Sequence, residues 1–496
     1  MFRTDSSQQD SFINPFDFLG PKRKELLEAG WAALFKNHLI DQIPVEEIKA
    51  CFHKKMGRPT KEIRTMLGVL LLQQMFDLTD DETIRQLAFN TEWHYALNLR
   101  LEDDASKYIC ERTLRTYRLL VVQHEIDQLL FRTLPDTLLD KLNISTKKQR
   151  LDSTHIRSDM RRLSRLELFR KTIKKFLKVM RREHARLLKK NAAPELIDRY
   201  LEKKNGYFAQ VKPSEAQVVL QQVAEDLLVL VEAFRTNPKI SGMKVFGLLQ
   251  RVLNEQCNVT GAGEESNVEI KAPKEISSGS LQNPSDEDAG YSGHKGEGYQ
   301  VQLMETYHEE KPDDKSVQPD LITYLEVEAA NCSDSDAVMP AVQETKERGC
   351  APEELLADSL YGSDDNVQKA AKEGVDLTAP TMGKPKSKKT RIVLDDFTMD
   401  EETGEVTACP AGEVPYEIQK GKDDGLKLYF DPATCEACDH LDYCSVGAES
   451  NKDHKLEYTP KQLRLAKRRV AEESEDPKEF REKYRWRSGI EAVNAK

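Results

Sequence analysis

The sequence contains 496 residues, of which 39% are hydrophobic and 32% are charged, and its formal net charge is −11. This length predicts two to four domains, and the acidic balance argues against a uniformly basic nucleic-acid binder. The densest apolar run, MLGVLLL at 66–72, is far shorter than the roughly 20 residues of a membrane span. Because the N-terminus also lacks the pattern of a secretory signal, we expect a cytoplasmic protein with no membrane partner.

Residues 1–145 are predicted to be mostly helical. Apolar residues recur at helical spacing from Ile63 to Met75. Another helix is predicted after Thr79, which would be its N-cap with Glu82 as the capping-box partner. Short helices separated by tight turns are typical of helix-turn-helix DNA-binding modules, and equally of any small bundle. We take DNA binding as the working hypothesis for this N-terminal domain.

A short strand and a helical block are predicted next, from QRLDSTHI (149–156) to residue 255. Residues 160–190 are strongly basic and amphipathic, which fits either a solvated helix face or a DNA-binding face. The excess of one charge in an acidic chain favours contact with DNA phosphates. The candidate contacts are Arg161, Arg162, Lys174 and Lys175. Residues 258–290 are rich in Gly, Ser and acidic residues, which predicts a loop or linker.

Strand signals become clear in the next part of the chain. GYQVQLMETY (298–307) and LITYLEVEAA (321–330) are β-rich and separated by a polar turn. A helix is predicted from near Ser333 to Gly349, followed by the strand ELLADSLYGS and another helix. Strands followed by alternating helix and strand predict an α/β sheet with helices on its faces.

Four of the nine cysteines are close together in sequence: Cys409, Cys435, Cys438 and Cys444. A Cys-x2-Cys pair with two further cysteines nearby is the spacing of a tetrahedral structural zinc site. Without metal, the same residues would be reduced surface cysteines in a loop, and His440 is an alternative fourth ligand. We expect Zn²⁺ in a small cysteine-rich insert at 396–455.

Three acidic residues occupy positions where a metal-dependent phosphoryl-transfer site could form. Asp152 lies in RLDSTHI, Asp358 ends LLADSLYGS, and Glu491 lies in a helix near the end of the sequence. Two divalent cations need several converging carboxylate oxygens and open positions for phosphate and water. Taken singly each residue is a weak signal, because an Asp before Ser or Gly is more often a turn or cap residue.

Several stretches in combination resemble the DDE transposases of bacterial insertion sequences. In chain order they are RLDSTHIRSD, NPSDEDAGYSGHKGEGYQVQLMET, LLADSLYGSDDN and YRWRSGIEAVNA. The last is similar to the Tyr-x2-Arg-x3-Glu-x6-Lys signature of that group, through Tyr484, Arg487 and Glu491. The likeness also covers MGRPTKEIRTMLGVLLLQQMFDLTDDETIRQL near the N-terminus and the cysteine-bearing insert, so it spans most of the chain.

The resemblance implies an α/β fold with an RNase H-like catalytic core. That core would comprise residues 146–160 and 275–395, with a basic helical insertion and linker at 161–274 and a helical C-terminal part at 456–496. It also implies a homodimer or larger multimer acting on transposon ends and target DNA in a bacterial, nucleoid-associated setting.

The family mechanism implies that Asp152, Asp358 and Glu491 hold two Mg²⁺ (or Mn²⁺) ions. Asp152 would lie on the first strand, Asp358 at the end of the fourth, and Glu491 on the closing helix. The ions would activate water, and later a DNA 3′-hydroxyl, for in-line attack on phosphodiesters. No covalent protein–DNA intermediate is expected. Tyr484 and Arg487 would then steady DNA phosphates beside the metals.

Other residues near these motifs have both structural and functional interpretations. Arg487 and Glu491 are spaced for a plain i,i+4 ion pair, which is compatible with phosphate contact. Lys295 and Tyr299 begin a strand after a Gly-rich turn and are structural or close to DNA, and Lys295 is kept as a candidate DNA contact. His155 either supports Asp152 or is an ordinary packed histidine.

Two alternatives to an active transposase remain open from the sequence. The chain could be a metal-dependent nuclease of the same fold, or an inactive transposase remnant that only binds DNA. The signature lysine would fall seven residues after Glu491, past Lys496. On this ground we expect a C-terminal truncation, with a short terminal helix that frays and holds Glu491 weakly.

Overall fold

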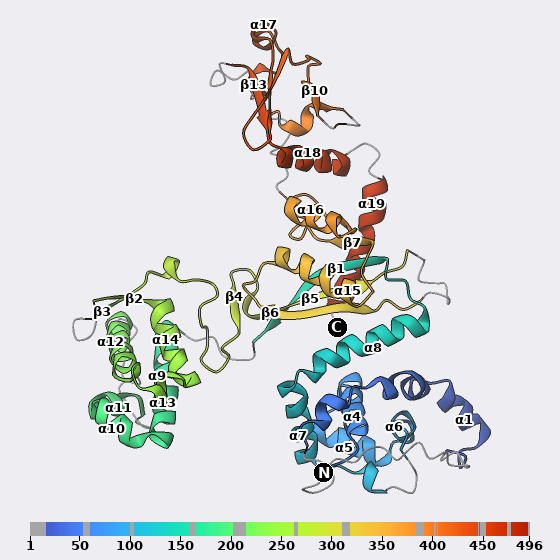
Figure 1. Ribbon diagram of the computed structural model, residues 1–496, viewed down its shortest axis with the longest axis vertical. Helices are drawn as coiled ribbons and strands as arrows, with labels where there is room; N and C mark the ends of the chain where they lie inside the picture. The colour runs from blue at the N-terminus through green and yellow to red at the C-terminus, as the bar shows by residue number, and fades with distance from the viewer. Residues whose placement is uncertain are drawn as a thin grey trace.

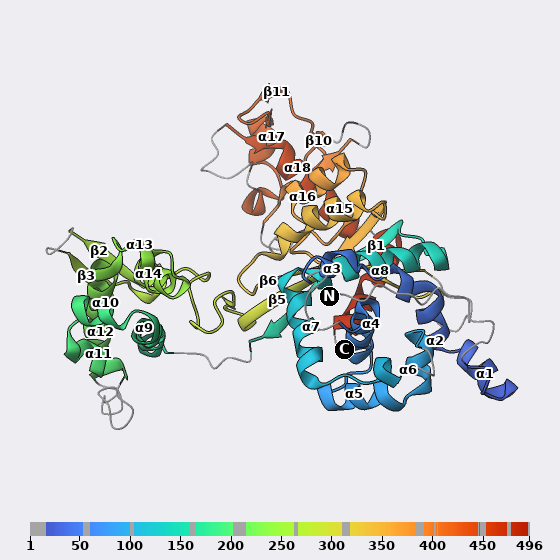
Figure 2. The same cartoon turned by 60° about the horizontal axis from the view of Figure 1, so that its bottom comes forward.

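The protein is described by a computed structural model that covers residues 16–52, 60–99, 104–158, 164–201, 215–261, 266–309, 318–382, 391–400, 403, 405–444, 446, 453–473 and 478–494. A mixed sheet lies at the centre, with N-terminal helices on one side and a cysteine-rich module at the far end (Figure 1). A helical insertion projects sideways from the sheet, as a second view also shows (Figure 2). None of the described helices is long and apolar enough to cross a membrane.

The N-terminal unit is a helical bundle built around α4. That helix carries the apolar run predicted from the sequence, and Met66, Leu67 and Leu72 on it are fully buried. The predicted capping box of Thr79 and Glu82 is present at the start of α5. The elements of the unit are α1 (Pro21–Glu28), α2 (Trp31–Leu34), η1 (Phe35–Leu39), η2 (Ile40–Gln42), α3 (Glu46–Lys49), α4 (Ile63–Met75), α5 (Asp80–Phe89), α6 (Thr91–Ala96), η3 (Asp104–Lys107), α7 (Glu111–Gln123) and α8 (Ile126–Leu142).

The central sheet has the order β4-β5-β1-β7-β8, and β6 also pairs with β5. Pairing is antiparallel from β6 through β5 to β1, and parallel from β1 through β7 to β8. The strands are β1 (Lys148–Arg157), β4 (Gly290–Ser292), β5 (Gly296–Thr306), β6 (Ile322–Ala329), β7 (Glu354–Ala357) and β8 (Asp376–Thr378). The associated helices are η8 (Asp334–Ala337), α15 (Val338–Glu347), α16 (Asp364–Lys372), α18 (Pro460–Glu473), α19 (Lys478–Tyr484), η11 (Arg485–Ser488) and α20 (Gly489–Asn494).

The two faces of the sheet are covered by different segments. Leu151 and Met304 pack with α15 in one apolar cluster. Val301 and Leu303 pack with Ile490 of α20 in another. Because side chains alternate along a strand, Asp152 lies on the opposite face from Leu151, and so on the face toward α20.

The insertion between β1 and β5 has its own apolar core, formed mainly by α9, α12 and α14. Its elements are α9 (Arg165–Glu183), α10 (Ala185–Asn191), α11 (Pro194–Leu201), α12 (Ala216–Phe234), α13 (Pro238–Ser241), α14 (Lys244–Gln256), β2 (Cys257–Thr260) and β3 (Asn267–Ile270), with η7 (Pro273–Glu275) following. The prediction of a loop or linker over 258–290 is therefore wrong in part. The β2–β3 hairpin adds Val268 to the core of the insertion, which the Gly- and acid-rich composition concealed.

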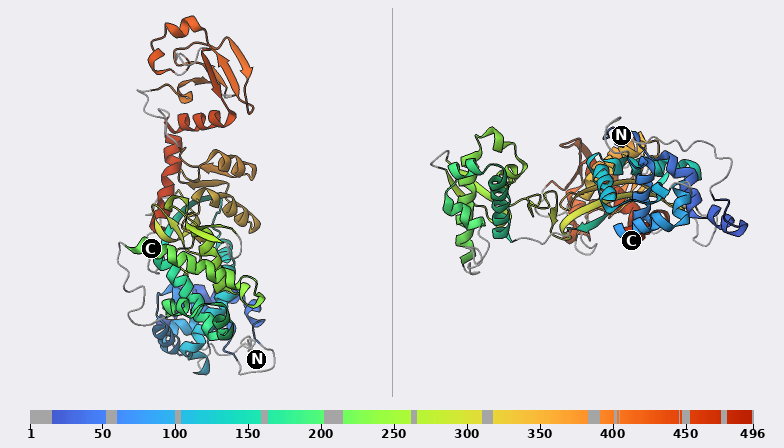
Figure 3. Two further views of the ribbon diagram at one scale, coloured as in Figure 1. Left: turned by 90° about the vertical axis from the view of Figure 1, so that its left-hand side faces the viewer. Right: turned by 90° about the horizontal axis from the view of Figure 1, so that it is seen from below.

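The cysteine-rich module is connected to the sheet through α18 and α19 (Figure 3). It contains η9 (Leu394–Asp396), β9 (Thr398–Met399), β10 (Val406–Ala408), β11 (Glu417–Lys420), β12 (Leu426–Tyr429), α17 (Pro432–Glu436), η10 (Leu441–Tyr443) and β13 (Lys455–Tyr458). Arg464 of α18 makes two hydrogen bonds to the Asp364 carboxylate at the start of α16, at 2.9 and 2.7 Å. This ion pair fixes α18 against the α/β part.

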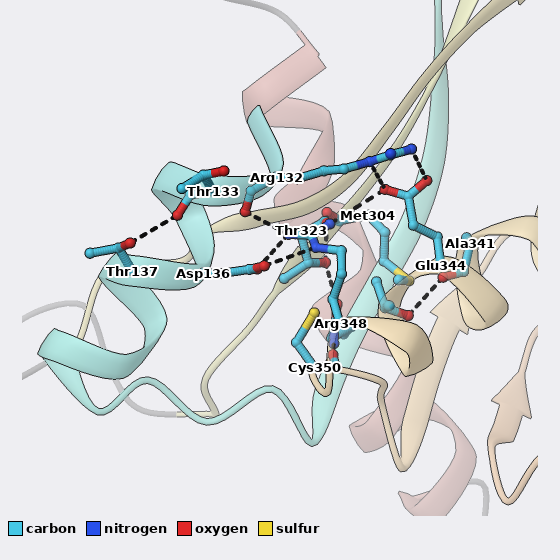
Figure 4. Close-up of polar contacts among 12 residues, drawn as sticks. Arg132, Thr133, Asp136, Thr137, Met304, Thr323, Ala341, Glu344, Arg348 and Cys350 are labelled. Atoms are coloured by element: carbon cyan, nitrogen blue, oxygen red, sulfur yellow. Dashed lines mark hydrogen bonds and ion pairs between the residues drawn. The ribbon is translucent and has the colours of Figure 1, made fainter. Parts of the chain in front are cut away.

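Charged side chains attach α8 to the sheet region (Figure 4). Arg348 donates to the Asp136 carboxylate at 2.5 and 3.1 Å and to the Thr323 carbonyl at 2.6 Å. Arg132 makes a second two-pronged pair with Glu344, at 3.1 and 3.2 Å. The N-terminal bundle is thus joined to the sheet by α8 and specific ion pairs with α15 and the chain beyond it.

Candidate active site

Asp152 and Asp358 lie next to each other at the point where the parallel pairing of β1 and β7 ends. Leu151 of β1 pairs with Ala357 of β7. Asp152 directly follows Leu151, and Asp358 directly follows Ala357. Burial raises the pKa of Asp152, the Arg487 charge lowers it, and the nearby Asp358 charge raises it, with a net upward shift. The Asp358 carboxylate is therefore close enough to raise the pKa of Asp152.

Arg487 connects this edge with the predicted third carboxylate. Its Nη2 atom is 2.8 Å from Asp152 Oδ1, and its Nη1 atom is 2.7 Å from Glu491 Oε1. The Asp152 side chain is 10% exposed and the Glu491 side chain 62%. A single guanidinium group thus bridges a nearly buried carboxylate and a mostly exposed one.

Tyr484 lies among the same groups. Burial raises the pKa of its phenol, Arg487 lowers it, and the charges of Asp358, Asp152 and Glu491 raise it. For Arg487, burial lowers the pKa, but Asp152, Tyr484 and Asp358 raise it overall. Electrostatic interactions therefore connect Tyr484, Arg487 and Glu491 of the signature with the two aspartates. Among the residues described, no three His, Cys, Asp or Glu side chains stand in an arrangement that could hold a metal ion.

Arg150 anchors the segment that carries these residues, although no sequence motif singled it out. Its Nε donates to Glu305 Oε1 at 2.7 Å, its Nη1 to the Trp486 carbonyl at 2.7 Å, and its Nη2 to Asp320 at 3.2 Å. A Cβ added at Gly489 would lie 2.0 Å from Arg150 Nη1, so glycine permits this close approach. The sequence signal for this role was the position of Arg150, a charged residue inside a strand and two positions before the candidate catalytic Asp152.

Lys295 and Tyr299 are both engaged within the fold. Lys295 Nζ lies 3.2 Å from Ser153 Oγ and 3.7 Å from the Asp334 carboxylate. The Tyr299 hydroxyl donates to Asp286. These contacts match the structural interpretation of the pair, and direct DNA contact by Lys295 stays a prediction. Burial, followed by the charges of Lys295 and Arg157, lowers the pKa of His155.

The predicted cationic residues of the insertion differ from one another. Lys175 donates to the Pro284 carbonyl and lies 3.4 Å from Glu287, so it ties α9 to the chain that returns to the sheet. Lys174 is half-buried, and burial followed by the charges of Arg170 and Lys178 lowers its pKa. A row of like charges therefore follows one face of α9. Arg161 and Arg162 lie outside the described residues.

The cysteine-rich module brings the four predicted zinc ligands to one pocket of about 740 Å³, lined also by His440. All four thiols are free. Burial raises the pKa of the Cys435 thiol to about 11, and the neighbouring Cys444, Cys409 and Cys438 thiols add to the shift. The module therefore gathers residues that are up to 35 positions apart in the sequence.

Residues 31–113 match a family model described as Transposase domain (DUF772). The matched segment runs from α2 into the first turn of α7, within the N-terminal helical bundle. The match supports a transposase family and a function related to transposition, which implies interaction with DNA. No curated protein and no solved structure matches the chain.

Proposed function

Starting from the transposase domain at 31–113, we propose that this chain is a DDE transposase with Asp152, Asp358 and Glu491 as its catalytic carboxylates. The observation that carries the proposal is the position of Asp152 and Asp358 at one edge of the parallel pair β1 and β7, with Arg487 joining Asp152 to Glu491. Carboxylates delivered from the point where two parallel strands stop pairing, and from a covering helix, can form a phosphoryl-transfer centre.

We further propose that the sheet is an RNase H-like core. Support comes from the order β6-β5-β1-β7-β8, in which two antiparallel pairings are followed by two parallel ones. The helical insertion interrupts the chain between β1 and β5 and leaves the pairing of these two strands intact over nine residue pairs. The catalytic edge is therefore built without any residue of the insertion.

The donor set fits Mg²⁺ or Mn²⁺, which prefer carboxylate oxygens. Asp152, Asp358 and Glu491 would hold the ions, which when bound supply charge stabilisation at the phosphodiester. Arg487 now pairs with two of these carboxylates, so it has to release oxygen atoms before they bind a cation. Once turned outward, its planar guanidinium group is suited to a DNA phosphate. Tyr484 is close enough to support that contact.

Arg150 and Ile490 determine where Glu491 lies. Ile490 is fully buried against Val301 and Leu303, while Arg150 binds the Trp486 carbonyl. The exposed Glu491 carboxylate therefore extends from a firmly packed turn of helix. We propose that these two residues position Glu491 and do not touch DNA.

DNA contacts outside the centre are proposed for the N-terminal bundle and for α9. Lys174 with its like-charged neighbours Arg170 and Lys178 forms a face on which phosphate would relieve mutual repulsion. Action on paired transposon ends by a homodimer or larger multimer belongs to the same proposal. A bacterial cytoplasm, at the nucleoid, is the expected location.

The proposal is tested by strand cleavage and strand transfer with DNA that flanks the coding sequence, in Mg²⁺ or Mn²⁺. Asp152→Asn, Asp358→Asn and Glu491→Gln should each lower the rate roughly 100-fold or more, because each removes charge from the centre. Glu482→Gln, on the exposed side of α19, is the matched control and should retain activity.

The assay also separates the alternative functions. Cleavage of plasmid without joining of a pre-cut end would identify a nuclease. DNA binding with no metal-dependent cleavage would identify a remnant. Full activity in any of the three carboxylate variants would refute the assignment of that residue.

A further inference from the structure

We propose that Cys409, Cys435, Cys438 and Cys444 bind one structural Zn²⁺ ion that holds the cysteine-rich module together. The proposal is independent of the transposase assignment. The proposed zinc site lies in the cysteine-rich module, which joins the rest of the chain through α18. The carboxylates lie at the central sheet and on α20.

The first cysteine, Cys409, lies in a tight turn. Gly412 N donates to the Cys409 carbonyl at 2.8 Å, and Cys409 N donates to the Glu413 carbonyl at 2.8 Å. Gly412 has φ of +89°, which an L side chain rarely adopts, so the turn depends on glycine. This Cys-Pro-x-Gly turn follows β10 directly.

The Cys-x2-Cys pair lies at the end of α17, with Cys435 in the helix and Cys438 in the turn that follows it. Cys438 N donates to the Cys435 carbonyl at 3.2 Å, and His440 N points at Cys438 Sγ at 3.4 Å. Cys444 is placed by a different connection, a bridge between its backbone and Ile392. Four sulfur-bearing positions therefore reach one pocket from three separate parts of the module.

The apolar core of the module is small. Its buried apolar side chains, among the residues described, are Phe397, Val406, Leu428, Phe430, Val446 and Tyr458. The strands are no more than four residues long, and β11 is exposed along its whole length. A unit of roughly 60 residues with so little buried area generally needs a metal or a cross-link for stability.

Thiolates at these four positions would satisfy the tetrahedral coordination that Zn²⁺ prefers and leave no position for substrate. As the side chains stand, no three of the described ligand-type groups form a metal-holding set, so the thiols must turn toward the ion. All four cysteines line the same pocket, so each thiol would turn toward one point within it. His440 lines it too, and its side chain is excluded from the proposed ligand set.

The first test measures the zinc content of the full chain. The protein is purified under reducing conditions without chelator and re-equilibrated with Zn²⁺. We expect about one zinc per chain by elemental analysis. The Cys435→Ser/Cys438→Ser double variant should lose it, and the Cys110→Ser/Cys332→Ser control should keep it. Less than roughly a tenth of an equivalent in the unmodified chain, or full retention in the double variant, would overturn the proposal.

Cobalt substitution and hydrogen exchange keep the test decisive if the double variant misfolds. Co²⁺ bound to the unmodified chain should show strong thiolate charge-transfer absorption, unchanged in His440→Ala. Loss of that absorption in His440→Ala would refute the four-cysteine ligand set. Stripping zinc should expose amides of 405–458 while β1 stays protected. Finding disulfides among the four cysteines by mass, with no bound zinc, would also overturn the proposal.

Discussion

Replacing Arg150 with Met should loosen the segment that carries Arg487 and Glu491. Arg150 is 6% exposed and Glu305 2%, so the change leaves a buried carboxylate without its cation. Removing one partner of a buried ion pair costs about 3–5 kcal/mol. The lost hydrogen bond to the Trp486 carbonyl adds about 1 kcal/mol. The sum is a large fraction of the roughly 5–15 kcal/mol that stabilises a domain.

The ionisation of Glu305 gives this prediction a pH dependence. Burial raises the pKa of Glu305 above its ordinary value of 4.5, whereas the Arg150 charge lowers it. Without Arg150 the folded-state pKa rises further, so the folded state binds more protons than the unfolded state above pH 4.5. Stability of the variant therefore falls as pH rises through that window. We expect a smaller defect near pH 5 than near pH 8.

Hydrogen exchange of peptides covering 485–494 is the appropriate assay, because it reports local opening in a multidomain chain. In Arg150→Met those amides should exchange much faster, while peptides in α4 stay unchanged. Adding Glu305→Leu should restore much of the protection, since removing both partners of a buried pair is often nearly neutral. Unchanged exchange at 485–494 in the single variant would refute the reasoning.

Three further outcomes follow from the same structure. Arg487→Gln should tighten Mn²⁺ binding roughly tenfold by calorimetry, about 1.4 kcal/mol, because the competing cation is gone; unchanged affinity would contradict this. Gly489→Ala should destabilise by about 1–3 kcal/mol in thermal unfolding, because its methyl group displaces Arg150, and an unaltered midpoint would argue against that contact. Lys174→Gln with Lys178→Gln should reduce the slope of log DNA affinity against log salt by about 2, and an identical slope would remove α9 from the DNA interface.

The sequence predicted elements well where the signal was local. The structure confirms the strand around Asp152, the capping box at Thr79 and the strands at 298–307 and 321–330. These elements could be predicted because side-chain alternation and helix capping depend on residues that are neighbours in the sequence. The strand before Asp358 was predicted too long, since β7 ends at Ala357 and the polar residues after it turn into α16.

Long-range pairing could not be derived from local patterns. Arg150 reaches Trp486 across 336 positions, and nothing in either stretch indicates the other. Lys175 was interpreted as a phosphate contact from the charge of its helix, yet it pairs with Glu287 on the returning chain. The family resemblance implied that the three carboxylates lie together, whereas their spacing in the sequence did not. A pattern of charges along the chain does not indicate which residues contact each other in the fold.

The 336 positions between Arg150 and Trp486 also determine the order in which parts of the chain can fold during synthesis. At ribosomal speeds of about 5–20 residues per second, roughly 20–70 s separate the synthesis of the two ends of this contact. During that interval β1 can pair with β5 and β7, and the insertion can complete its own core, while Glu491 has yet to be made. The nascent protein therefore passes through a long stage with an assembled scaffold and no complete set of the proposed catalytic carboxylates. For an enzyme that would cut DNA, assembly of the proposed active site is thereby deferred until the segment that carries Glu491 has been made.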